Sequence, residues 1–124
     1  MSQLTGYRVL IAEDEALVAL QLEEVVRDMG CEVVGPVSRL ADLIARIEAR
    51  DFDGALLDIN LRGELVFDSL PRFRALGTPF IVTSGYDAKT LFPPDFRDAP
   101  RITKPFDEAA LRRMCLEVFA KPSA

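Results

Sequence analysis

Four apolar runs of this 124-residue chain each end in polar side chains that could act together. Glu13 and Asp14 follow the first run, Asp58 the second, Ser84 the third and Lys104 the fourth. If the runs are parallel strands of one sheet, their carboxyl ends meet at one edge, which is where such sheets bind ligands. We therefore predict an acidic, Mg²⁺-binding pocket around an aspartate that can carry a phosphoryl group.

The three carboxylates are the reason to expect a metal ion. An acid at the end of the apolar run Ala55–Asp58 is costly to bury, and two more acids beside it add a repulsion that a divalent cation relieves. The chain has no histidine, so the usual zinc sites and histidine-based acid–base catalysis are excluded and oxygen ligands remain. Oxygen ligands are typical of Mg²⁺, with Mn²⁺ as the alternative ion.

The other polar residues suggest phosphoryl chemistry. Beside a cation, Asp58 could act as a nucleophile toward phosphorus, while Lys104 holds one phosphate oxygen and the Ser84 hydroxyl donates to another. Each residue also has a simpler interpretation, because Asp14 could be a helix N-cap, Ser84 a turn hydroxyl and Lys104 a solvated side chain. Their placement after successive strands favours a shared site.

Strands alternate with helices along the chain, which favours a parallel sheet covered on both faces. The expected strands are Tyr7–Ala12, Glu32–Val37, Gly54–Asp58, Phe80–Thr83 and Pro100–Thr103. The expected helices cover Glu15–Met29, a stretch from an N-cap at Ser38 through Ile47, Leu65–Leu76, and a last helix capped by Asp107. Asn60–Gly63 is expected to be a loop, and Pro71 should kink the third helix or shift its start.

Prolines interrupt the region where a further helix would complete the alternation. Pro93, Pro94 and Pro100 lie within Asp87–Pro100, so a full helix is improbable there and we expect a mobile loop.

Composition limits the class of protein. The chain is 49% hydrophobic and 28% charged, with a net charge of −5, so one soluble domain over 1–124 without an output domain is expected and direct DNA binding is disfavoured. We predict no membrane span and no signal peptide. Cys31 and Cys115 are interpreted as reduced core residues of a cytoplasmic protein.

The order of these motifs resembles the receiver domain of bacterial two-component response regulators. The segments that carry the resemblance are Val9–Glu15, Leu56–Leu61, Val82–Gly85 and Thr103–Phe106. It implies a flavodoxin-like (CheY-like), doubly wound five-stranded parallel sheet of order 2-1-3-4-5. It also implies a phosphorelay protein that takes a phosphoryl group from a phosphohistidine and catalyses only its own phosphorylation and dephosphorylation, rather than an enzyme in the ordinary sense.

The same resemblance assigns roles to individual residues. Asp58 would be the phospho-acceptor, and Lys104 would contact the phosphate. Asp14 would bind Mg²⁺ directly and Glu13 through water, and the backbone carbonyl of Asn60 would complete the metal shell. Ser84 would be the switch hydroxyl.

Within this family the chain is similar to stand-alone receivers. Pro79–Tyr86 is loosely similar to the pattern of the FAT GUY single-domain regulators, in which a flexible segment replaces the fourth helix. Val82 and Thr83 stand where that group prefers Phe and Ala.

The expected switch departs from the common receiver pattern. Receivers often carry an aromatic residue three positions before the lysine, and here that position is Arg101. We therefore hypothesise that ordering of Asp87–Pro100, or Arg101 itself, carries the signal. Tyr86 either influences water access to the acyl phosphate or is a surface tyrosine in a turn.

The first predicted helix suggests where partners bind. Its apolar face includes Leu17, Ala19, Leu20 and Val26, which is wider than packing on a sheet requires. Receivers dock histidine kinases or histidine phosphotransfer proteins through this helix; the alternative is a broad buried face. A downstream protein target and a homodimer also remain open.

Three alternative functions compete with the receiver. A haloacid dehalogenase-type phosphatase would need a second aspartate two positions after the nucleophile, where this chain has Asn60, which cannot protonate a leaving group. A receiver-like interaction module that is no longer phosphorylated is the second rival, and nothing in the sequence excludes it. Nucleotide or flavin binding is disfavoured, because the chain lacks a Gly-rich phosphate loop.

Overall fold

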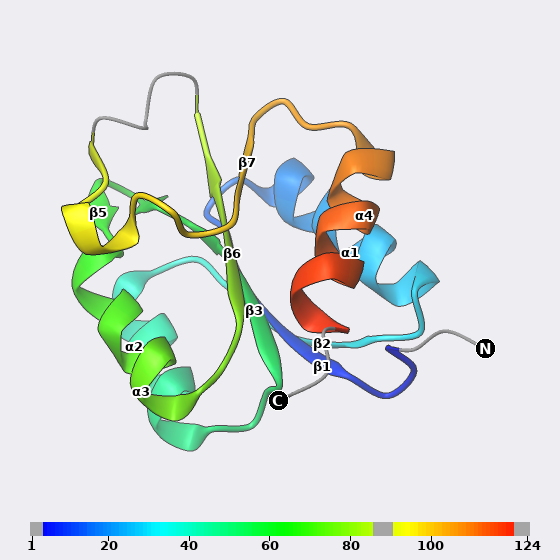
Figure 1. Cartoon of the computed structure of the whole chain (residues 1–124), viewed down its shortest axis with the longest axis horizontal. Coiled ribbons are helices and arrows are strands. Elements are labelled where there is room, and N and C mark those ends of the chain that lie inside the picture. The colour runs from blue at the N-terminus through cyan, green and yellow to red at the C-terminus, as the bar shows by residue number, and fades with distance from the viewer. Residues whose placement is uncertain (1–3, 86–90, 121–124) are drawn as a thin grey trace.

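A five-stranded parallel sheet forms the centre of the computed structural model, which describes residues 4–85 and 91–120 (Figure 1). Its strands are β1 (Arg8–Ala12), β2 (Glu32–Val37), β3 (Gly54–Asp58), β6 (Phe80–Ser84) and β7 (Arg101–Thr103). Their spatial order is β2-β1-β3-β6-β7. When the five strands are counted along the chain this is the expected order 2-1-3-4-5, so the predicted doubly wound, flavodoxin-like fold is confirmed.

Helices cover both faces of the sheet (Figure 1). The helices are α1 (Ala16–Asp28), α2 (Leu40–Ala49), α3 (Leu70–Leu76) and α4 (Glu108–Phe119). Buried side chains of α1 and α4 pack with Ile11, Leu56 and Ile81 on one face. Those of α2 and α3 pack with Leu10, Leu57 and Val82 on the other. Strand residues thus alternate between two cores, as period-2 side-chain geometry requires when both faces are buried.

Two local predictions were wrong, and a third boundary moved as expected from Pro71. Asn60–Gly63 is not simply a loop, because β4 (Asn60–Leu61) and β5 (Glu64–Leu65) pair as an antiparallel hairpin. Ser38 is not the N-cap of α2: Arg39 occupies that position and makes no side-chain capping bond. The third helix begins at Leu70 instead of Leu65, after a 3₁₀ turn at Phe67–Ser69, so its start is shifted as Pro71 led us to expect. Pro71 explains the later start, because proline is favoured in the first turn of a helix, where its missing N–H has no partner to lose.

Other boundaries agree with the sequence patterns. The Asp107 side chain accepts a hydrogen bond from the Ala109 amide at 3.3 Å and caps α4 as predicted. The described part of the proline-rich stretch, residues 91–100, contains a 3₁₀ turn at Pro94–Phe96 and no α-helix. Cys31 and Cys115 are buried free thiols.

Across residues 4–85 and 91–120, none of the helices has the length and apolar character needed to cross a bilayer.

Candidate functional site

Three carboxylates meet at the carboxyl edge of the sheet, which is uppermost in Figure 1. Glu13 and Asp14 follow β1 and Asp58 ends β3, and these strands pair directly, with Ala12 opposite Leu57. Oxygen atoms of the three side chains lie within 4.8 Å of one another. Glu13 and Asp58 are buried and Asp14 is partly exposed. The structure thus brings together the acids that the sequence analysis selected from two distant segments.

Lys104 supplies the positive charge of this cluster. Its Nζ lies 2.7 Å from Glu13 Oε1 and 2.8 Å from Asp58 Oδ2, and 3.8 Å from Glu15 Oε1. The Lys104 amide donates to the Ser84 carbonyl at 2.7 Å, which keeps the lysine backbone beside the end of β6. Burial acts to lower the pKa of Lys104, but Asp58 and Glu13 outweigh it and raise the pKa above its ordinary value.

The two metal-binding candidates after β1 have opposite pKa shifts. Burial raises the pKa of Glu13 to about 7, although Lys104 and the Glu15 amide oppose the shift. Partial burial also acts to raise the pKa of Asp14, but the hydrogen bond from the Arg62 amide and its other partners outweigh it, so the pKa lies below its ordinary value. Asp14 is therefore the better anionic ligand, while Glu13 needs compensating positive charge to stay ionised.

The β4–β5 hairpin closes one side of the cluster. The Asn60 amide donates to Asp58 Oδ1 at 3.1 Å, and Asn60 Oδ1 accepts from the Gly63 amide at 2.7 Å. The Arg62 amide donates to Asp14 Oδ2 at 3.0 Å. Arg62 and Gly63 both have positive φ, +53° and +91°, as the primed turns of two-residue hairpins require. Sequence reasoning missed Arg62; the Arg-Gly pair between two short strands was the available signal.

The predicted switch residues lie in different surroundings. Ser84 ends β6, is buried, and lies at the same sheet edge as Asp58. The Arg101 guanidinium lies 5.1 Å from the centre of the Phe92 ring and donates to the Arg97 carbonyl at 3.0 Å. Arg101 is thus attached to the segment before β7. Tyr86 lies outside the described residues, as do positions 87–90.

The apolar residues of α1 that form the predicted docking face differ in their exposure to solvent. Ala19 and Val26 are buried in the core, whereas Leu17 is 83% exposed and Leu20 50% exposed. The apolar width of this helix therefore reflects both packing on the sheet and an uncovered leucine pair.

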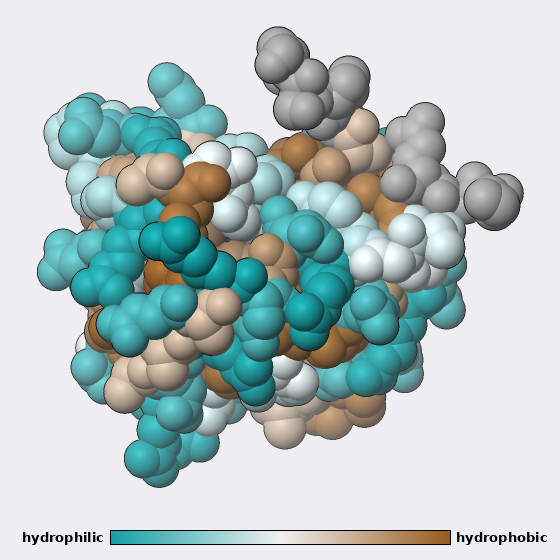
Figure 2. Space-filling model, turned by 90° about the horizontal axis from the view of Figure 1, so that it is seen from below, coloured by the Kyte–Doolittle hydropathy of each residue, from teal (hydrophilic) through white to brown (hydrophobic). Residues whose placement is uncertain are grey.

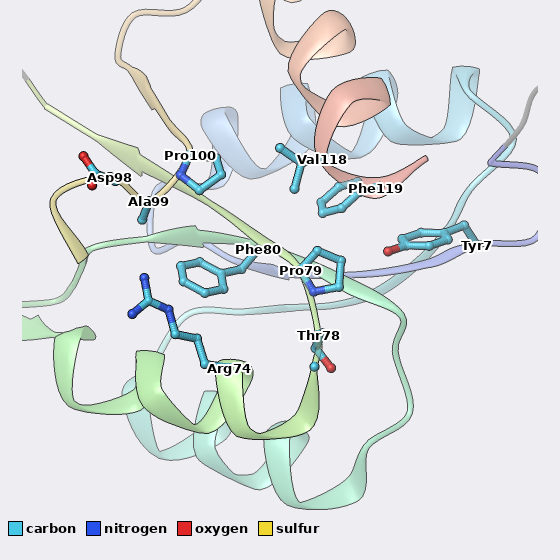
Figure 3. A pocket seen from close by; sticks show the side chains of 11 residues that line it. Tyr7, Arg74, Thr78, Pro79, Phe80, Asp98, Ala99, Pro100, Val118 and Phe119 are labelled. Atoms are coloured by element: carbon cyan, nitrogen blue, oxygen red, sulfur yellow. The ribbon is translucent and has the colours of Figure 1, made fainter. Parts of the chain in front are cut away.

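A pocket of about 620 Å³ lies at the other end of the sheet and contains none of the predicted site residues. Arg74, Phe80, Pro100 and Phe119 are among its lining residues (Figure 3). Figure 2, which views the molecule from below, shows this end with hydrophilic side chains over much of its surface and smaller apolar areas between them. Size alone does not make this pocket the functional site, because the clustered charges lie elsewhere.

Residues 9–115 match the response regulator receiver domain family. The chain belongs to this family. Solved structures agree with the assignment. SdrG from Sphingomonas melonis Fr1 is 35% identical, with a TM-score of 0.78 over 92% of this chain and 95% of that chain. The receiver domain of PhyR from Erythrobacter litoralis is 28% identical, with a TM-score of 0.79 over 98% of each chain.

A more distant receiver shares the fold of this one. The CheY-like receiver protein from Methanospirillum hungatei JF-1 is 23% identical, with a TM-score of 0.77 over 91% of this chain and 93% of that chain. No curated protein matches this receiver domain.

The acid cluster of this receiver domain fits one hard divalent cation. Its donors are all carboxylate oxygens, the ligands that Mg²⁺ prefers, and they lie within 4.8 Å of one another. Three acids face one ammonium group, so a cation would also compensate the remaining negative charge.

Proposed function

We propose that this receiver accepts a phosphoryl group on Asp58 from a phosphohistidine of a sensor kinase or histidine phosphotransfer protein, in an Mg²⁺-dependent reaction. The observation that carries the proposal is the position of Asp58, whose carboxylate lies within 4.8 Å of the acids that follow β1 and 2.8 Å from the ammonium of Lys104. The same arrangement would serve relay, phosphate storage or target binding.

The step needs a nucleophile and charge compensation. A carboxylate oxygen of Asp58 attacks phosphorus, and a P–O bond forms as the P–N bond to the donor imidazole breaks. The electron pair of the broken bond stays on the imidazole, which takes up a proton. Lys104 binds a phosphoryl oxygen, and Ser84 donates a hydrogen bond to another.

Four residues would hold the metal ion. Asp14 and Asp58 supply carboxylate oxygens, Glu13 acts through water, and Asn60 supplies its backbone carbonyl. Bound Mg²⁺ supplies positive charge beside the phosphoryl oxygens.

We further propose that the donor docks against α1. Leu17 and Leu20 are exposed on that helix, and exposed apolar side chains near a charged site are the features that a helical partner can cover.

The structural change that follows phosphorylation would be carried by Arg101 and by residues 91–100, the segment before β7. A new dianion at Asp58 attracts cations and polar backbone, and Arg101 already contacts Phe92 and Arg97. Amide exchange of residues 91–101 with and without beryllofluoride, a phosphoryl mimic, tests this route. Equal exchange in both states would contradict it.

Intact-mass measurement tests the phosphoryl transfer itself. Wild-type protein incubated with phosphoramidate and Mg²⁺ should gain the mass of one phosphoryl group, and Asp58→Asn should gain none. Asp95→Asn, which alters an exposed aspartate on the 3₁₀ turn, should label like wild type. A wild type that stays unmodified would favour the interaction module instead.

A further inference from the structure

Thr83 lies directly beside the phospho-acceptor candidate. It is the Cα partner of Asp58 in the parallel ladder between β3 and β6. Its exposed fraction is 0%, and its hydroxyl oxygen has no hydrogen-bond partner among the described residues. A buried hydroxyl without a partner costs free energy, so its presence calls for an explanation.

Strand alternation places the Thr83 side chain on the face covered by α1 and α4. Ile81, two residues earlier, and Ile102, the Cα partner of Thr83 on β7, both pack in that core. Asp58 lies on the same face, because Leu56 packs there as well.

The Lys104 side chain must pass over β6 near Thr83 to reach Asp58. Lys104 follows β7 and Asp58 ends β3, and β6 lies between those two strands. The Lys104 side chain nevertheless reaches Asp58 Oδ2 at 2.8 Å, so it spans β6 at its carboxyl end. The Thr83 side chain therefore lies beneath the path of Lys104.

We propose that Thr83 is a positioning residue for Lys104, and that its hydroxyl accepts an N–H of the ammonium group when that group turns from the Asp58 carboxylate toward the phosphoryl oxygens. An ammonium has three donors, and two of them face Glu13 and Asp58 in this structure. Phosphorylation converts one Asp58 oxygen into the bridging oxygen of an acyl phosphate, which is a poor acceptor, and this frees a donor. This inference rests on the proposed function.

Isosteric substitution separates the hydroxyl from the space it fills. In Thr83→Val the rate of labelling by phosphoramidate at saturating Mg²⁺ should fall about fivefold, equivalent to ~1 kcal/mol of transition-state stabilisation. Thr83→Ser keeps the hydroxyl and should label at nearly the wild-type rate. The melting temperature of unphosphorylated Thr83→Val should equal or exceed that of wild type, because the variant removes an unpartnered buried hydroxyl.

If Thr83 only filled space, the order of the labelling rates of the two variants would be reversed. Thr83→Val would then label like wild type and Thr83→Ser would be slower, which would overturn the proposal. Thr78→Val makes the same change near the opposite end of β6 and should leave the labelling rate unchanged.

If Thr83→Val does not fold, Thr83→Ala tests the same hydroxyl and should also label slowly. A wild type that takes no label defeats the proposed function, and this inference with it, whereas a labelled wild type with an unaffected Thr83→Val defeats this inference alone.

Discussion

At the scale of single residues, Lys104 balances the charge of the site. Its ammonium contacts two buried carboxylates at 2.7 and 2.8 Å. A buried pair of this kind adds little net stability, but removing one partner leaves an uncompensated charge. The ammonium and an incoming metal ion also compete for the same acids.

Lys104→Met should therefore have two measurable effects. Without Mg²⁺ the free energy of unfolding should fall by about 3 kcal/mol, because Glu13 and Asp58 lose their counter-charge. Mg²⁺ should bind roughly tenfold more tightly, because a competing cation is gone. Urea unfolding and titration calorimetry measure these changes. Arg112→Met, which removes a surface cation 3.7 Å from Asp28, should change neither quantity, and unaltered Mg²⁺ affinity in Lys104→Met would contradict the argument.

Tyr7 gives a prediction about pH. Burial, followed by the nearby Asp53 charge, raises the pKa of Tyr7 from about 10 to about 12, and its hydroxyl donates to the Asp53 carbonyl at 3.0 Å. Because the folded-state pKa is the higher one, the stabilisation is fully present below pH 10 and is lost as the pH rises toward 12.

Ultraviolet absorbance measures this titration. In Tyr86→Phe protein, Tyr7 is the only tyrosine, and it should remain protonated at pH 11, where free tyrosine is largely ionised. The stability lost between pH 9 and pH 11 in urea unfolding should be smaller in a Tyr7→Phe variant. A midpoint near 10 in the folded state would refute the prediction.

At the scale of elements, the β4–β5 hairpin connects the two halves of the acid cluster. Asn60 contacts Asp58 at one end, and Arg62 contacts Asp14 at the turn. A third hydrogen bond runs from the Gly63 amide to Asn60 Oδ1. All three bonds use backbone amides as donors, so the turn conformation, more than the side-chain types, determines whether they form.

Gly63→Ala tests the importance of the turn. At φ +91° a Cβ is strained even though nothing lies within 4 Å of it, so the free energy of unfolding should fall by about 1–2 kcal/mol. The Arg62 amide should exchange faster with solvent, because its bond to Asp14 weakens. Gly85→Ala also has open space and no positive φ, and should be close to neutral. Equal stability of the two variants would contradict the proposed strain.

At the scale of the whole molecule, one glycine lies where three elements that are distant in the sequence meet, at the amino end of the sheet. Gly54 begins β3, and an added Cβ would lie 2.8 Å from Phe119 Cε1 and 2.9 Å from Tyr7 Cε2. The Tyr7 and Phe119 rings stack at 5.4 Å. The absence of a side chain at Gly54 thus lets the ring of Phe119, in the last turn of α4, and the ring of Tyr7, just before β1, pack at the start of β3.

Gly54→Ala should reduce the free energy of unfolding by about 1–3 kcal/mol, because a buried ring must shift to admit the methyl group. The labelling of Asp58 should persist in the folded protein, because the change lies at the opposite end of the sheet. Adding Phe119→Leu should recover part of the lost stability. Urea unfolding of the single and double variants measures both effects, and an additive loss in the double variant would argue against a steric cause.

The sequence by itself determined the strands and the positions of the chemical groups, and its resemblance to receiver domains implied the strand order. Apolar runs bounded by polar residues encode strands locally, and alternation with helices imposes parallel, right-handed connections. Asp58 and Lys104 could therefore be placed at one sheet edge before any distance was known. The late start of α3 at Leu70 also follows from a local cause, Pro71.

Only the tertiary structure decided the contacts among these groups. The path of Lys104 over β6, the amide of Arg62 on Asp14 and the enclosed hydroxyl of Thr83 depend on which strands are neighbours and on the rotamers that packing selects. Leu17 and Val26 differ in exposure although both are apolar residues of one helix. The physical reason is that hydrophobic periodicity is a local property of the chain, whereas hydrogen bonds and ion pairs between segments require ångström-scale geometry that exists only after packing.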